Sequence, residues 1–81
     1  MQAMIEFVEK TFASDMPECK VSVIPLICED DKVEFEIHVL GVDATNFLNF
    51  FSCKRCIRKE LQDRVDTIFF PWESDEDRFF A

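Results

Sequence analysis

Residues 33–39 read Val-Glu-Phe-Glu-Ile-His-Val, a strict alternation of apolar and polar side chains. Successive side chains of a β-strand point to opposite faces, so this stretch predicts a strand that is buried on one side only. Its apolar side chains would face a core, whereas Glu34, Glu36 and His38 would share the other face. A strand of this kind needs one covering layer, and it decides the fold class.

A second β-rich run precedes this strand. Residues 20–27 are rich in β-branched side chains and are apolar on both alternating faces. Pro25 interrupts them and has no amide N–H for pairing, which indicates a bend or an edge position. The polar residues 29–32 separate the two runs, so we predict an antiparallel hairpin that ends at Gly41, the only glycine in the chain.

Two other segments have helical spacing. Apolar residues recur at intervals of three and four over about residues 2–14, which predicts an amphipathic helix that stops before Pro17. A second helical pattern starts at Ala44, directly after Asp43, which is a good N-cap residue.

The apolar stripe of this second helix shifts near Ser52. Either the helix continues, with the long side chains of Lys54 and Arg58 reaching out of an apolar face, or it breaks and Ser52 caps a new helix that begins at Cys53. The sequence leaves both alternatives open.

Residues 65–70 are β-branched and aromatic and are followed by Pro71. They could finish the helix, but we favour a third strand that ends at Pro71, because two strands alone make a poor sheet. The expected fold is therefore α+β: a small single domain of helix, strand, strand, helix and strand, with the helices packed on one face of a short antiparallel sheet. We assign residues 1–72 to this domain and residues 73–81 to an acidic C-terminal tail.

Composition supports one folded domain. The 81 residues are 48% hydrophobic and include ten Phe but no Tyr, and Phe provides buried area without a hydroxyl group that needs a hydrogen-bond partner. Residues 1–6 contain no basic leader, and charged residues follow within a turn, so we expect neither a signal peptide nor a membrane span. We therefore predict a cytoplasmic protein whose four cysteines are reduced.

Cys53 and Cys56 are spaced like the ligands of a zinc site or the thiols of a redox pair. A four-cysteine zinc site would also need Cys19 and Cys28, which lie roughly 30 Å apart if the first strand is continuous. A redox pair would need a position at a helix N-terminus and a preceding β-α-β unit, and the expected element order lacks that unit. We therefore predict no metal and no other cofactor.

Other catalytic signatures are missing from the sequence. His38 is the only histidine, and no serine lies in a glycine-containing nucleophile turn. The single glycine also excludes the usual phosphate-binding loops. We therefore predict that the protein is not an enzyme.

Charge is distributed unevenly along the chain. Residues 53–64 hold five of the nine basic residues, although the net charge is −8. Four of the five form what we call the cationic cluster: Lys54, Arg55, Arg58 and Lys59. They could pair with the acidic hairpin of the same molecule or of a twin subunit, or they could bind an acidic protein surface or phosphates. The candidate partner-binding residues are this cluster together with Glu34, Glu36, Phe79 and Phe80.

These features favour a small acidic module that binds a protein target stoichiometrically and does not bind nucleic acid or membranes directly. In length and composition the chain resembles the small inhibitors and immunity proteins of phages and mobile elements. One alternative is a nucleic-acid mimic that occupies the cationic groove of a nucleic-acid enzyme, and another is a small cysteine-ligated metal or thiol-redox protein. Surplus apolar surface and an open sheet edge also predict a homodimer.

Overall fold

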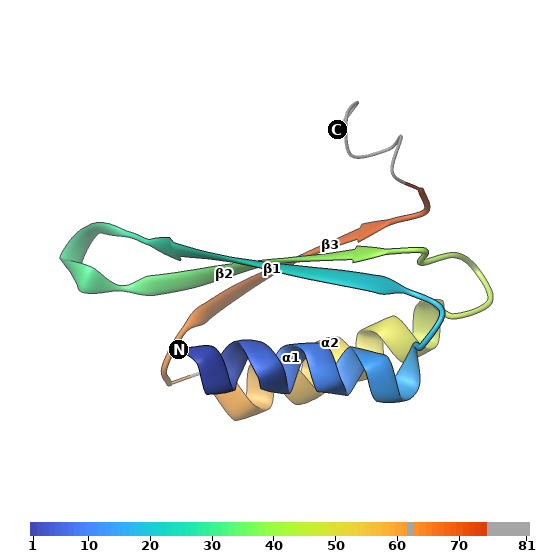
Figure 1. The fold of residues 1–81 in the computed structure, drawn as a ribbon, viewed down its shortest axis with the longest axis horizontal. Coiled ribbons are helices and arrows are strands. Elements are labelled where there is room, and N and C mark those ends of the chain that lie inside the picture. Colours follow the sequence, from blue (N-terminus) through green and yellow to red (C-terminus); the bar gives the residue numbers. More distant parts are fainter. Residues whose placement is uncertain (62, 75–81) are drawn as a thin grey trace.

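The computed structural model describes residues 1–61 and 63–74. It contains two helices, α1 (Gln2–Asp15) and α2 (Phe47–Leu61), and three strands, β1 (Lys20–Ile27), β2 (Val33–Leu40) and β3 (Asp66–Trp72). A short 3₁₀ turn, η1 (Glu29–Asp31), joins β1 to β2. Both helices lie on the same face of the sheet (Figure 1), which confirms the expected α+β fold and its element order.

The sheet has the order β1-β2-β3 and is mixed. β1 and β2 form the expected antiparallel hairpin, but β2 and β3 are parallel, so the prediction of a purely antiparallel sheet was wrong. The reason is α2, which carries the chain back along the sheet, so that the next strand must run in the direction of β2. β2, α2 and β3 therefore form the β-α-β unit that we had not expected.

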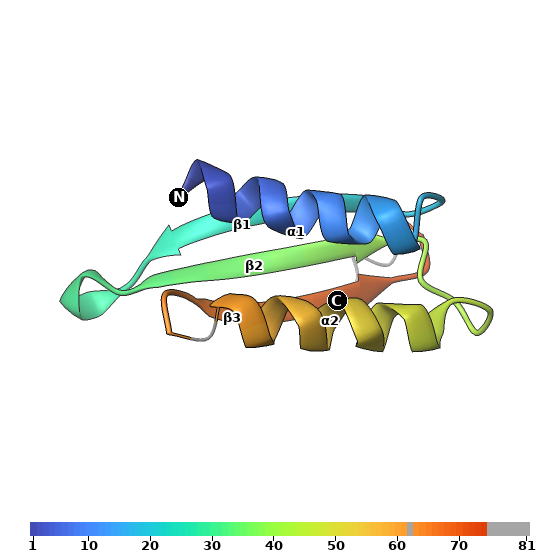
Figure 2. The same cartoon turned by 90° about the horizontal axis from the view of Figure 1, so that it is seen from below.

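The β1–β2 hairpin extends beyond the ends of both helices (Figure 2). Pro25 lies within β1, an edge strand, as the sequence indicated, whereas β3 continues through Pro71 to Trp72 and does not end at the proline. Gly41 follows β2 with a φ of 100°, a conformation that side-chain-bearing residues rarely adopt.

The core lies between β2 and the two helices. Phe35, Ile37 and Val39 of β2 are fully buried, as the alternation predicted. The helices contribute Val8 and Phe12 of α1, and Phe50, Cys53, Ile57 and Leu61 of α2, and Met16, directly after α1, is also fully buried. Cys53 is thus one of the residues that join the two helices, in line with the tendency of reduced cysteine to be buried.

α2 is continuous through Ser52, so the alternative with a break was wrong. The helix begins at Phe47 and not at Ala44, because the carboxylate of Asp43 accepts a hydrogen bond from the N–H of Thr45 and closes a turn before the helix. The C=O of Asn46 accepts the first helical bond, from the N–H of Phe50. Over residues 1–61 and 63–74, neither helix combines the length and the hydrophobicity needed to cross a membrane.

Candidate functional site

The sheet has a second face that no helix of the described residues covers (Figure 1). We call it the open sheet face. Strand alternation and register place on it Lys20, Ser22, Ile24 and Leu26 of β1, Glu34, Glu36, His38 and Leu40 of β2, and Asp66, Ile68, Phe70 and Trp72 of β3.

Apolar side chains of the two outer strands flank the carboxylates of β2 on the open sheet face, and Asp66 of β3 adds one further carboxylate beside Glu34. Ile24, Leu26 and Ile68, on the two outer strands, are 40%, 38% and 39% exposed, although residues of this type are usually buried. Between them runs the central strand with Glu34 and Glu36. An acidic row flanked by apolar rows is a surface that can bind a partner by burial and by charge.

Three side chains of this face are joined by two hydrogen bonds, one between β3 and β2 and one along β2. Trp72 Nε1 donates to His38 Nδ1 at 3.0 Å, and His38 Nε2 lies 3.3 Å from Glu36 Oε1. Phe70 lies beside them, with its ring stacked on His38 at a centroid distance of 4.6 Å. These contacts fix the aromatic part of the open sheet face before any partner binds. His38 is thus a hydrogen-bonded and partly covered residue, not a free group on a flat exposed strand.

The free edges of the sheet are poorly suited to binding another strand. The N–H of Cys28 donates to the C=O of Lys32, and the C=O of Trp72 accepts the N–H of Gly41, which fixes the alternation of the backbone groups. By this alternation Pro25 of β1 and Pro71 of β3 would each direct an N–H to a free edge, and proline has none. A partner strand would therefore lose a hydrogen bond at each edge.

The cationic cluster lies on α2, in the layer of the helices. Lys54 Nζ lies 5.9 Å from the ring centroid of Phe69 and the Arg58 guanidinium 5.5 Å from it, so these long side chains extend over an aromatic ring, as the continuous-helix alternative predicted. Glu34 and Glu36 lie on the opposite face of the sheet, and no ion pair among the described residues joins the cluster to the hairpin.

The two thiols of α2 have different surroundings. Cys53 is fully buried, with Sγ 3.6 Å from Asp15 Oδ2 and 3.8 Å from the C=O of Thr11, whereas Cys56 is exposed. Burial, followed by the nearby Asp15 carboxylate, raises the pKa of Cys53 to about 12. A redox thiol needs a lowered pKa and access, and Cys53 has neither.

The other two cysteines lie at opposite ends of one strand. Cys19 and Cys28 directly flank the continuous strand β1, as the argument against a four-cysteine zinc site required. Among residues 1–61 and 63–74, no group of three or more His, Cys, Asp or Glu side chains is placed to hold a metal ion. The absence of a cofactor stays a prediction.

The predicted site residues thus fall on two surfaces: Glu34 and Glu36 on the open sheet face, and the cationic cluster on α2. Phe79 and Phe80 lie outside the described residues. Sequence reasoning missed Phe70 and Trp72. A signal for them was present in the sequence: the outer strands are apolar on both alternating faces, so helices on one side of the sheet must leave apolar side chains exposed on the other. No protein-family model, curated protein or solved structure matches this chain.

Proposed function

We propose that this protein is a protein-binding module, not an enzyme, and that it binds a segment of its target on the open sheet face. The observation that carries the proposal is the arrangement of that face, an acidic row between exposed apolar rows. It fits a segment whose Lys or Arg side chains are flanked by apolar ones. Such a segment would bury the apolar rows and neutralise the carboxylates in one step.

The contacts within the face support tight binding. Because the hydrogen bonds from Trp72 to His38 and from His38 to Glu36 already hold these side chains, little conformational entropy would be lost when a partner binds. Because Pro25 and Pro71 each remove a hydrogen-bond donor from a free edge of the sheet, a partner is expected to bind the face of the sheet and not its edges. A stoichiometric inhibitor or immunity protein, of the kind that phages and mobile elements carry in the cytoplasm, is one form that such a module can take.

Nucleic-acid mimicry is the competing proposal. A mimic presents an array of negative charges to a cationic groove. Here Glu34 and Glu36 are followed along β2 by His38 and Leu40, and they lie beside Leu26 and Ile24 of β1 and beside Asp66 and Ile68 of β3. This interruption of the acidic row favours a protein partner with apolar side chains.

Affinity capture from the native host, repeated with matched variants, tests the proposed function. We expect the double variant Glu36→Lys/Ile68→Ser to lose the proteins that the wild type enriches, because it reverses the central charge and removes an apolar side chain. Glu9→Lys, on the exposed side of α1, makes a comparable change of charge elsewhere and should retain them. Equal capture by both variants would contradict the assignment of the open sheet face.

The homodimer is a separate prediction that light scattering at micromolar concentration can check. A second copy would bring three carboxylates of each open sheet face, Glu34, Glu36 and Asp66, toward three others, so we expect any dimer to strengthen as salt screens this repulsion. A mass near 9.6 kDa at every salt concentration would contradict the dimer and leave a different protein as the occupant of the face.

A further inference from the structure

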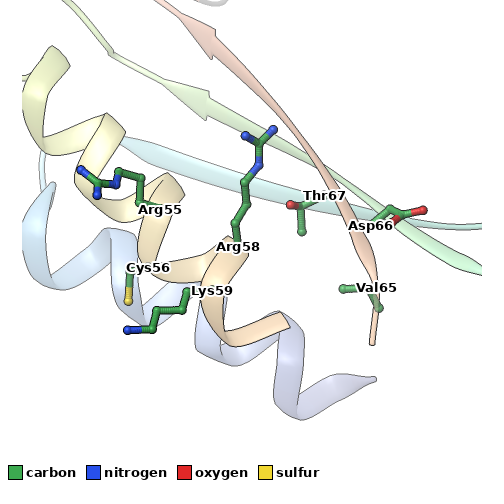
Figure 3. A pocket seen from close by; sticks show the side chains of 7 residues that line it. All are labelled: Arg55, Cys56, Arg58, Lys59, Val65, Asp66 and Thr67. Atoms are coloured by element: carbon green, nitrogen blue, oxygen red, sulfur yellow. The ribbon is translucent and has the colours of Figure 1, made fainter. Parts of the chain in front are cut away.

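The cationic cluster borders a hollow between the C-terminal half of α2 and the start of β3 (Figure 3). The hollow is open to solvent and has a volume of about 840 Å³, within the range of small-molecule pockets. Arg55, Arg58 and Lys59 line it from the helix and Thr67 from the strand, and Asp66 is an acidic residue at its wall. It lies in the helical layer, apart from the open sheet face.

The three cations of the hollow have no anionic partner within the described residues. The two ion pairs recorded there join His38 to Glu36 and Arg64 to Glu60, and neither involves the hollow. Arg58 and Lys59 lie in the last turn of α2, where the helix dipole favours positive charge. That effect does not explain Arg55, one turn earlier. In a chain of net charge −8, the unpaired cluster indicates that an anion completes it.

The cations of the hollow point in two directions in the absence of a ligand. Arg58 extends beside β3, whereas Arg55 and Lys59 point to the other side of the helix (Figure 3). Side chains three and four positions apart on a helix start about 5–6 Å from each other, so two of them can reach one anion by changing rotamer. The Arg58 guanidinium lies over the Phe69 ring, 5.5 Å from its centroid.

β3 adds neutral donors to the same hollow. Backbone alternation from Trp72, whose C=O faces the β2 side, directs the N–H of Thr67 to the free edge of the sheet. The Thr67 side chain lies on the helical face and lines the hollow. A hydroxyl and a free N–H are thus available beside the guanidinium groups.

We propose that this hollow binds a small molecule that carries a diphosphate group. Arg55 and Arg58 would pair with phosphate oxygens through their planar forks and Lys59 as a point charge. Thr67 would donate to a further oxygen.

Titration of the whole protein with pyrophosphate at constant ionic strength, followed by amide chemical shifts and calorimetry, tests the proposal. We expect saturable binding with shifts at Arg55, Arg58 and Thr67. Arg58→Gln and Arg55→Gln should each weaken binding about tenfold, through loss of a charge-assisted hydrogen bond. Arg55→Gln serves as the second variant because Arg55 is exposed. Lys10→Gln, on exposed α1, is the matched control and should bind as the wild type does.

Two results would overturn the proposal. One is the absence of saturable shifts, or equal affinity of the two arginine variants and the wild type. The other is binding of a hexaglutamate peptide, dependent on Arg55 and Arg58, without binding of pyrophosphate, which would assign the hollow to an acidic peptide. Neither result bears on capture by the open sheet face, so the two proposals fail separately.

Discussion

Phe12→Ala is expected to lower the free energy of unfolding by about 3–5 kcal/mol, the usual cost of removing a fully buried Phe side chain. Phe12 is 0% exposed, and its ring lies 6.2 Å from that of Phe50 and 6.4 Å from that of Phe69. It therefore joins α1 to both α2 and β3. Small domains are stable by roughly 5–15 kcal/mol, so the variant should be close to unfolding, and urea denaturation followed by circular dichroism measures the loss.

Phe47→Ala is the matched control for this experiment. Phe47 also lies among aromatic rings, with Phe51 at 4.7 Å, but its side chain is 44% exposed. The same truncation should cost only about 1 kcal/mol, because much less apolar area returns to water. Similar losses for the two variants would contradict the position of Phe12 at the centre of the core.

Most of the fold could be predicted because local signals agree with one another. The alternation of residues 33–39 specified both a strand and its buried face, and β2 has Phe35, Ile37 and Val39 in the core, as expected. For Pro25 the sequence indicated a bend or an edge position because proline lacks an N–H, and the structure has the edge position. The order of elements followed from these residues and from the helical spacing of residues 2–14.

The direction of β3 could not be predicted in the same way. Residues 65–70 carry strand signals, but no local pattern states whether a strand runs parallel or antiparallel to its neighbour. That depends on the length of α2, and the sequence left a break at Ser52 open. Once α2 runs unbroken along the sheet, β3 must start near the end where β2 starts.

The candidate site was predicted in part. Charge counting found the cationic cluster and the carboxylates of β2, but it could not show that the sheet lies between them. The apolar rows were missed because placing Ile24 and Ile68 on either side of Glu36 requires the register of all three strands, which no local pattern gives. Composition therefore identified the charges, and the topology separates them into two surfaces.

Cys53 is expected to react with iodoacetamide at pH 8 about a thousandfold more slowly in the native protein than in urea. Only the thiolate is nucleophilic. At a fixed pH the thiolate population falls tenfold for each unit by which the pKa rises, and the pKa of Cys53 is raised from 9.0 to about 12. Burial further restricts access of the reagent. Mass spectrometry of peptides from the two conditions gives both rates, and exposed Cys56 in the same molecule shows that the reagent is active.

The same pKa shift makes stability depend on pH. Because its native pKa is raised, the Cys53 thiol stays protonated in the folded protein at pH values above 9, where the thiol of the unfolded chain ionises. The contribution of this thiol to the free energy of unfolding is therefore complete below about pH 9 and is lost as the pH rises toward about 12. In Cys53→Ser a hydroxyl that does not titrate can still donate to Asp15. The free energy of unfolding of the wild type should therefore fall more steeply over this range than that of the variant, and parallel pH profiles would show that Cys53 ionises equally in both states.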